Sequence, residues 1–349
     1  MSEASPALGQ AERASPEISI PLLRRWLDAL YTIPRADLRT VDPVTRWLVL
    51  TRAPVLVMTA VSALIGGLLA ARDDAFDPVL VALAALGVVI AHAASNLVND
   101  FWDFQRGADT PDSPRVTYGP HAFASDVVER RSVLLVTLGL LAAATAAGVY
   151  LTVARGPGVL AFALAGALVL LLYSGGPLPL KYFGLGEASV LLVWGPLMIG
   201  GTYYVSAGEL PWWVVVASLP YAFGVTSVVM GKHLDKLEFD SRRRIRTLPV
   251  VLGEASARRA TQALLVAMYA STFALAVWQR MPGLLLVAGA LPLLRLSLRA
   301  YGESKPLAPP EGYPGWPLWF VAFAFIHVRR FGGLFLCGLV LQLAVEAAF

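Results

Sequence analysis

Residues 78–109 read PVLVALAALGVVIAHAASNLVNDFWDFQRGAD and join a long apolar run to a polar end. The run over 78–99 reaches the roughly 20 residues that a helix needs to cross the hydrocarbon layer of a membrane. Asn96, Asp100 and Asp103 follow the spacing i, i+4, i+7, which places them on one face of a helix. Acidic side chains at the end of a membrane helix are costly unless they face the protein interior and have a function. We therefore expect a membrane-spanning helix that ends in a polar site.

The composition of the whole chain agrees with a membrane protein. Its 349 residues are 57% hydrophobic and 15% charged, whereas soluble domains carry roughly 25% charged residues. A chain this apolar is neither an ordinary soluble enzyme nor a disordered chain. The net charge of +4 suits an anionic membrane surface or an anionic substrate, and we expect no nucleic-acid partner. The single cysteine, Cys337, excludes an intrachain disulfide and a cysteine-based metal site.

Nine stretches are apolar enough to span a membrane. They are residues 47–70, 78–99, 132–153, 158–173, 188–206, 212–231, 260–278, 282–298 and 331–348. A shorter apolar segment, 316–326, is assigned to the loop before the last helix. Residues 1–40 form a polar extension, in which 20–33 has the amphipathic pattern of an interfacial helix. The sequence thus predicts an all-α, multi-pass membrane domain of nine helices over residues 41–349.

Basic residues are distributed unequally over the loops between these nine segments. If the N-terminus is cytoplasmic, the outer loops contain only Arg72, Arg155 and Arg280 of the 28 Lys and Arg residues. Lys and Arg accumulate in the cytoplasmic loops of membrane proteins. We therefore expect an integral protein of a bacterial-type inner (plasma) membrane, with its N-terminus in the cytoplasm and its C-terminus outside.

Two polar segments on the predicted cytoplasmic side contain the residues suited to chemistry. The end of the second span offers oxygen ligands from Asn96, Asn99, Asp100 and Asp103. Such ligands suit Mg²⁺, which takes one or two carboxylates and fills its other positions with water and phosphate oxygens. The loop over 231–249, GKHLDKLEFDSRRRIRTLP, places acids directly before arginines, an arrangement that suits a magnesium diphosphate. The alternative interpretations are a solvated helix end and, for residues 242–244, an ordinary basic loop.

The stretch over 96–109, NLVNDFWDFQRGAD, resembles the first aspartate motif of the UbiA-type intramembrane prenyltransferases. It is most similar to the branch that prenylates 1,4-dihydroxy-2-naphthoate in menaquinone synthesis. The pattern N-x-x-N-D-x-x-D with a further G-x-D is matched by Asn96, Asn99, Asp100, Asp103, Gly107 and Asp109. Residues 173–187, and Asp240 with 247–249, are similar in order and spacing. The resemblance covers about residues 45–300 and implies a nine-helix, UbiA-like bundle with its active site on the cytoplasmic side.

This resemblance implies the Mg²⁺-dependent transfer of a polyprenyl group from a prenyl diphosphate to an aromatic acceptor within the lipid bilayer. The metal ligands that it implies are Asn96, Asn99, Asp100, Asp103 and Asp109 on one side and Asp235 and Asp240 on the other. The diphosphate would be bound by Arg115, Tyr173, Lys181 and Lys232, with Asp100, Asp103 and Lys181 as the catalytic residues.

The second motif departs from the family pattern, because Lys236 stands where an acid is common. Asp235 lies one residue away, and His233 and Glu238 are the other candidates for this metal site. Asp235 and Asp240 are five residues apart, roughly 140° around a helix. Either the helix bends between them or one of them is not a ligand.

Other functions are compatible with parts of the sequence. A transporter is disfavoured because the charged residues gather at one membrane face instead of near the midplane. An enzyme that moves CDP-linked head groups with a D-x-x-D-G motif is disfavoured because Phe104 follows Asp103. Within the same superfamily, 4-hydroxybenzoate, homogentisate, haem and a glycerol lipid are alternative acceptors. We expect His92 and His327 to be packing residues.

Overall fold

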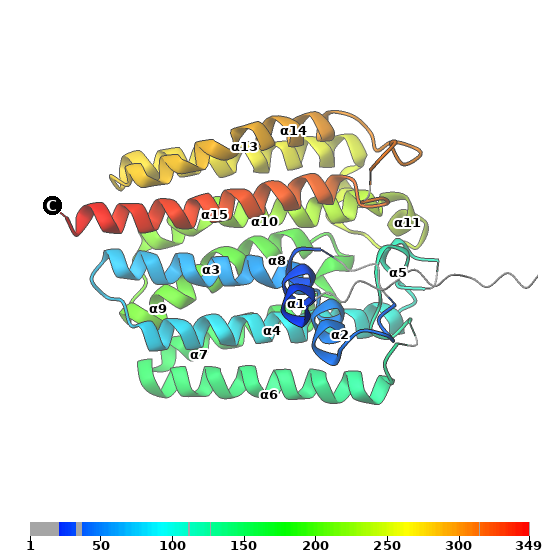
Figure 1. Ribbon diagram of the computed structural model, residues 1–349, viewed down its shortest axis with the longest axis horizontal. Helices are drawn as coiled ribbons and strands as arrows, with labels where there is room; N and C mark the ends of the chain where they lie inside the picture. Colours follow the sequence, from blue (N-terminus) through cyan, green and yellow to red (C-terminus); the bar gives the residue numbers. More distant parts are fainter. Residues whose placement is uncertain (1–20, 33–36, 111, 126, 314, 349) are drawn as a thin grey trace, which may run out of the picture.

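The computed structural model describes residues 21–32, 37–110, 112–125, 127–313 and 315–348. All regular structure in these residues is helical, apart from one isolated bridge between Phe183 and Arg246. Figure 1 shows long helices lying side by side along a common axis. Because many of them are long and apolar enough to cross a membrane, the chain is an integral membrane protein with an all-helical fold.

Eight helical segments of the described chain have the length and hydropathy of a membrane span. They are α3 (Ala53–Arg72), α4 (Pro78–Gln105), α6 (Arg130–Arg155), the consecutive α8 (Gly186–Leu192), η2 (Val193–Gly200) and α9 (Gly201–Ala207), α10 (Trp212–Asp235), α13 (Glu254–Trp278), the consecutive η3 (Pro282–Ala290) and α14 (Leu291–Gly302), and α15 (Phe320–Glu346). The fourth predicted span corresponds to a shorter apolar helix of 16 residues, α7 (Pro157–Leu172). Each of the nine predicted segments therefore overlaps a helix of the described chain, but only eight helical segments have the length of a membrane span.

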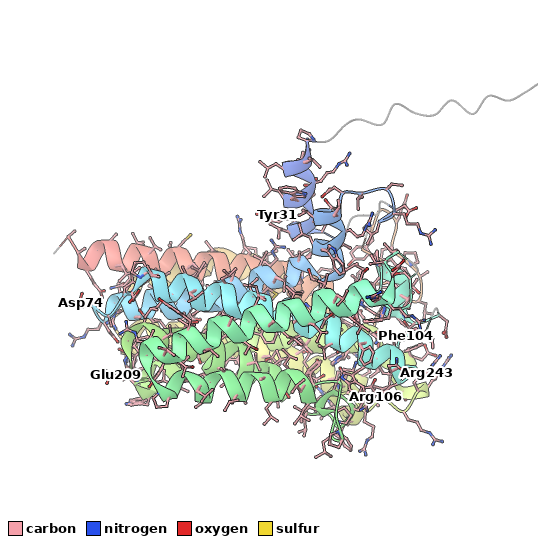
Figure 2. All side chains as sticks on the ribbon, turned by 90° about the horizontal axis from the view of Figure 1, so that it is seen from below. Tyr31, Asp74, Phe104, Arg106, Glu209 and Arg243 are labelled. Carbon is pink, nitrogen blue, oxygen red and sulfur yellow. The ribbon has the colours of Figure 1, made fainter. Side chains whose placement is uncertain are left out.

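Short helices gather toward one end of this bundle (Figure 1). They are α1 (Leu22–Tyr31), α2 (Pro43–Leu50), α5 (Pro114–Tyr118), η1 (Leu180–Tyr182), α11 (Leu237–Arg242) and α12 (Leu248–Leu252). The helix α1 confirms a helix within the predicted amphipathic segment, and Figure 2 shows it projecting from the side of the bundle at Tyr31. The rest of the predicted polar extension includes residues 1–20 and 33–36, which lie outside the described residues.

The first predicted span, 47–70, is not one continuous helix. Helix α2 ends at Leu50 and α3 begins at Ala53, with Arg52 between them in the left-handed conformation at φ 60°. Pro54 at the second position of α3 explains the break, because a proline lacks the N–H that a continuing helix would need. The break turns the Arg52 side chain toward α4.

The last span begins earlier than the sequence predicts. Most of 316–326, assigned to a loop, forms the first turns of α15, which begins at Phe320. Arg329 lies inside this helix, donates to the carbonyl of Leu30, 3.0 Å away, and places its guanidinium over the ring of Tyr31. These contacts with α1 allow a charged residue inside the long helix.

Small residues allow the long helices to approach closely. A Cβ added at Gly66 of α3 would lie 2.3 Å from the carbonyl oxygen of Ile199 in η2. A Cβ added at Gly338 of α15 would lie 2.5 Å from the carbonyl oxygen of Gly283 in η3. Such contacts are typical of helix packing in membranes. They hold the bundle that positions the polar end of α4.

Candidate active site

Asp100, near the end of α4, is fully buried between two arginines. Arg115 Nη2 lies 3.2 Å from Asp100 Oδ2, and Arg52 donates to the other carboxylate oxygen. Arg52 reaches this position from the break between α2 and α3, and Arg115 from α5. Both oxygens of Asp100 are therefore already paired with cationic side chains.

Asp103, one turn further along α4, is held by the loop after α7. Lys181 Nζ lies 2.5 Å from Asp103 Oδ2, and the Tyr182 hydroxyl donates to Oδ1 at 2.9 Å. The loop folds back because Gly176 takes a positive φ of 66°, and the Lys181 amide donates to the carbonyl of Tyr173. Lys181, which the resemblance places at the diphosphate, therefore forms an ion pair with an acid of the first motif.

Asp109 lies close to Asp100, with His121 between them. His121 Nε2 is 3.1 Å from Asp109 Oδ2 and 3.8 Å from Asp100 Oδ1. Burial raises the pKa of Asp109, but the hydrogen bond from His121 and the charges of Lys236 and Lys181 outweigh it and hold that pKa below its usual range. Asp109 is therefore ionised at neutral pH. One ligand atom from each of Asp100, Asp109 and His121 lies within 4.8 Å of the others.

Asp240 reaches the same site from α11 and is 1% exposed. Neither of its carboxylate oxygens has a hydrogen-bond partner within the described residues. Lys236 Nζ lies 3.5 Å from Asp240 Oδ1 and 3.9 Å from Asp109 Oδ1. Burial lowers the pKa of Lys236, but the charges of Asp240 and Asp109 outweigh it and raise that pKa. Lys236, which stands where the family pattern commonly has an acid, thus lies between Asp109 and Asp240.

The structure corrects the expectation that Asp235 joins this site. The chain bends at Lys236, between α10 and α11, and Asp235 points toward α15. Its carboxylate accepts hydrogen bonds from the amides of Trp319, Phe320 and Val321 at 2.9–3.1 Å. Lys305 Nζ lies 3.5 Å from the same carboxylate. Asp235 therefore caps the N-terminus of α15, where free N–H groups attract an anion.

The two asparagines of the first motif have different neighbours. Asn96 donates from Nδ2 to the carbonyl of Thr51, 2.9 Å away, which ties α4 to the break before α3. Asn99 Oδ1 accepts from the Ser174 hydroxyl at 2.5 Å. Asn99 lines both a small charged pocket and a large apolar cavity, which are described below, whereas Asn96 lines the cavity alone.

A small charged pocket joins residues from α4, α5, α10, α11 and the loops between the spans. It is lined by Arg52, Asn99, Asp103, Asp109, Arg115, Lys181, Lys232, His233, Lys236 and Asp240. Most of these residues were predicted to belong to the site. The pocket combines several cations with acids whose oxygens lack hydrogen-bond donors in the described chain, a set of groups that suits an anion together with a divalent cation.

Two residues of the site, Arg52 and His121, carried no sequence signal, and the pairing of two others was not predicted. Arg52 and His121 lie in different loops, and nothing in their own segments predicts that both contact Asp100. Glu187 and His233 form a buried pair in which His233 Nδ1 lies 2.6 Å from Glu187 Oε1. Glu187 stands in the G-L-G-E stretch and His233 in the second motif, so both lay in motif segments although their pairing was not predicted.

A large apolar cavity lies next to the charged pocket. It has a volume of about 2190 Å³ and is lined mainly by apolar side chains of α3, α4, α6, α7, η2, α10 and α15. Asn96, Asn99, Arg115 and Lys232 line its polar end, and Tyr173 also faces it. Tyr173 is therefore placed beside the cavity and outside the lining of the charged pocket. The arrangement suits a molecule with an anionic head and a long apolar tail.

The acids of the pocket fit a divalent metal ion such as Mg²⁺. Asp109 Oδ1 and both oxygens of Asp240 are buried without hydrogen-bond donors in the described part of the chain. The Lys236 ammonium, 3.5 Å from Asp240 Oδ1 and 3.9 Å from Asp109 Oδ1, offsets part of the cost of burying these oxygens, and a bound divalent cation would offset the rest. Asp100 fits less well, because both of its oxygens are paired with arginines.

Comparison with known proteins gives a family match and several relatives. The model of the UbiA prenyltransferase family matches residues 59–309. The 1,4-dihydroxy-2-naphthoate octaprenyltransferase of Bacillus subtilis (strain 168) is 26% identical over 265 residues, which are 76% of this chain and 80% of that protein. The UbiA prenyltransferase domain-containing protein 1 of Mus musculus is 30% identical over 190 residues, which are 54% of this chain and 56% of that protein. The chain thus spans little more than half the length of the mouse protein.

Solved structures show the same fold. The apo structure of a UbiA homolog from Aeropyrum pernix K1 has a TM-score of 0.55 at 17% identity, covering 85% of this chain and 98% of that one. The structure of a UbiA homolog from Archaeoglobus fulgidus bound to Cd²⁺ has a TM-score of 0.54 at 15% identity, covering 83% and 98%. The helical arrangement described above is therefore one that occurs in other proteins.

Proposed function

Since the chain belongs to the UbiA prenyltransferase family, we propose that it transfers a prenyl group from a prenyl diphosphate to an aromatic acceptor. One observation carries the proposal: a pocket of cations and buried carboxylates, some of whose oxygens have no hydrogen-bond donor in the described chain, lies beside an apolar cavity of about 2190 Å³. The pocket would hold the diphosphate and the cavity the isoprenoid tail. A transporter is a weaker candidate, because the charged pocket lies at one end of the bundle instead of near its middle.

The cations of the pocket would bind the diphosphate and stabilise it as it leaves. Lys181, Lys232 and Arg115 line the pocket and carry the charge that the departing group needs. Fixed positive charge at the point where negative charge develops is an effective way to lower a barrier. The bond between the prenyl carbon and its oxygen breaks, and the diphosphate leaves. The aromatic ring attacks the resulting allylic cation and then loses a proton or, for 1,4-dihydroxy-2-naphthoate, its carboxylate as carbon dioxide. The apolar cavity keeps water away from that cation.

The metal ligands in this proposal are Asp109 and Asp240, with Asp103 and Asn99 beside them in the pocket. A bound Mg²⁺ would supply Lewis-acid polarisation of the phosphate oxygens. Asp100 would act by holding Arg52 and Arg115 in place. Tyr173 would contact the substrate from the cavity side.

The acceptor that we propose is 1,4-dihydroxy-2-naphthoate, which would place the protein in menaquinone synthesis. The N-x-x-N-D form of the first motif supports it, as does the similarity to the Bacillus subtilis octaprenyltransferase. The similarity to the mouse protein is comparable. The alternative acceptors within the same superfamily are 4-hydroxybenzoate, homogentisate, haem and a glycerol lipid.

We also propose where the protein lies in the cell and how its chain divides into two parts. The site would face the cytoplasm from a bacterial-type inner membrane, with the N-terminus inside and the C-terminus outside. Residues 41–349 would form the catalytic membrane domain. Residues 1–40 would be a polar extension whose helix α1 lies at the membrane surface. The basic loops and the position of α1 support this arrangement.

Two acids of α11 allow a matched test of the metal site. We expect Asp240→Asn to lower prenyl transfer at least 100-fold, because it removes a buried carboxylate from the pocket. Glu238→Gln should retain wild-type activity, because Glu238 is exposed and pairs with Arg242. Mass spectrometry of the prenylated product measures both. Equal activity of the two variants would contradict the assignment of Asp240.

A further inference from the structure

The large cavity contains a polar group of side chains within its apolar walls. His92 of α4 and Trp194 of η2 both line it. His92 Nδ1 lies 2.7 Å from the hydroxyl of Thr59 in α3. The rings of His92 and Trp194 meet edge to face, with centroids 5.0 Å apart and an interplanar angle of 86°. The two rings therefore hold each other in a fixed arrangement.

Two nitrogen atoms of this group have no hydrogen-bond partner among the described residues. Trp194 Nε1 is buried, and no hydrogen-bond acceptor for it is found in the described chain. Thr59 engages His92 Nδ1, which leaves Nε2 as the ring nitrogen available to a ligand. An isoprenoid tail is a hydrocarbon and offers neither a donor nor an acceptor. Buried polar groups are normally paired, so this part of the cavity is suited to a ligand that contains oxygen.

The backbone that carries Trp194 is unusual for a membrane span. Residues Val193–Gly200 form a π-helix that contains Pro196. Such wide turns are rare and occur frequently at functional sites. A Cβ added at Gly195 would lie 3.0 Å from the Cβ of Ala222. Gly195, the residue after Trp194, therefore packs tightly against α10. The wide turn thus positions Trp194 on the cavity side.

The position of His92 relative to the charged pocket suits binding of the aromatic acceptor. His92 precedes Asn96 by one helical turn and Asp100 by two, which corresponds to about 6 Å and about 12 Å along α4. A ring bound at His92 would lie just beyond a diphosphate held in the pocket, near the prenyl carbon that reacts. The cavity of about 2190 Å³ exceeds the roughly 300–1,000 Å³ of a site for one small ligand. A tail and a ring can therefore share it.

We propose that His92 and Trp194 form the subsite that binds the hydroxyl-bearing ring of the aromatic acceptor. Trp194 Nε1 donates a hydrogen bond to an oxygen substituent of the acceptor ring. His92 Nε2 forms a hydrogen bond with a hydroxyl of that ring, which can donate or accept. Thr59 fixes the orientation of the imidazole. This inference rests on the proposed function and specifies which residues recognise the acceptor. It also gives His92 a role beyond the packing expected from the sequence.

The test measures acceptor binding to the full chain, purified in detergent, by equilibrium dialysis. The probes are 1,4-dihydroxy-2-naphthoate, 4-hydroxybenzoate and 2-naphthoate, which lacks hydroxyls. We expect Trp194→Phe to raise the Kd of a hydroxylated probe about tenfold, or about 1.4 kcal/mol. The control Trp213→Phe should stay within twofold, because Trp213 packs against Tyr203 and does not line the cavity. Binding of 2-naphthoate should be equal in wild type and Trp194→Phe.

The outcomes separate the subsite from the proposed function. If Trp194→Phe binds the hydroxylated probes as tightly as Trp213→Phe does, while the wild type forms a prenylated product, the subsite is wrong and the function stands. If wild type binds neither hydroxylated probe and forms no prenylated product with any acceptor, both are wrong. A thermal melt of each variant checks that it is folded. His92→Phe, which keeps a ring at this position, should give the same selective loss of the hydroxylated probes.

Discussion

Asp235 and Asp240 show how two acids of one segment acquire different roles. The side chains of both are buried, and Asp240 lies five residues beyond Asp235, the last residue of α10. Asp235 receives three backbone hydrogen bonds from the start of α15, whereas the oxygens of Asp240 receive none within the described residues. The difference arises because the chain bends at Lys236. The carboxylate of Asp235, which accepts these hydrogen bonds, has a structural role. The carboxylate of Asp240, which accepts none from the described residues, is available to a ligand in the charged pocket.

Asp235→Ala should destabilise the protein by about 2–4 kcal/mol, because it leaves three amide donors and the Lys305 ammonium without their acceptor. The melting temperature of the detergent-purified variant measures this loss. At a temperature where the variant is folded, its prenyl-transfer rate should stay near that of wild type. A stable variant without activity would contradict the role of Asp235 as a helix cap and would indicate that Asp235 belongs to the active site.

At the scale of elements, hydropathy predicted the helices better than their ends. Each predicted span corresponds to a helix, because burial of an apolar segment in lipid depends mainly on length and composition. The break at Arg52 and the start of α15 at Phe320 depend on partners far away in the chain: Asp100 for Arg52 and Asp235 for the start of α15. Such partners are not visible in a local pattern.

The crossing of α15 and η3 supplies a prediction about packing. Gly338→Ala should cost about 1–3 kcal/mol, because its Cβ would lie 2.5 Å from the carbonyl oxygen of Gly283. Gly333→Ala on the same helix is the matched control, since a Cβ there meets no atom within 4 Å in the described chain. Thermal unfolding of both variants compares them. Equal melting temperatures would contradict the close approach of the two elements.

The whole molecule has two different ends. Figure 2 shows Asp74 and Glu209 at one end of the bundle and Arg106 and Arg243 at the other. The charged pocket lies at the second end, together with most of the basic loops. The positive charge therefore serves two purposes in our account. It orients the protein in the membrane, and it binds an anionic substrate.

Cysteine labelling in bacterial cells tests this orientation. In a Cys337→Ser background, a membrane-impermeant maleimide should label Glu209→Cys in intact cells. It should label Glu238→Cys only after the membrane is permeabilised, because we place α11 in the cytoplasm. Both native side chains are exposed, so access to reagent is not limited by burial. The reverse labelling pattern would place the active site outside.

The sequence predicted much of the site, but not how its parts meet. Asp103 with Lys181, and Asp109 with Asp240, come together as their motifs imply. The first motif is regular because one helix presents it. His121 and Arg52 were missed because their roles depend on where α5 and the break before α3 lie in space. Trp194 was missed because its environment, a cavity between several helices, exists only in the folded chain.

The most direct test of the central claim is a product assay with the purified full chain in lipid. Geranylgeranyl diphosphate and Mg²⁺ are supplied with each aromatic acceptor in turn, and the products are identified by mass spectrometry. We predict a prenylated product from 1,4-dihydroxy-2-naphthoate with loss of carbon dioxide, and no product when the divalent cation is chelated. A product with another aromatic acceptor alone would contradict the choice of naphthoate. No prenylated product with any acceptor would contradict the proposed function itself.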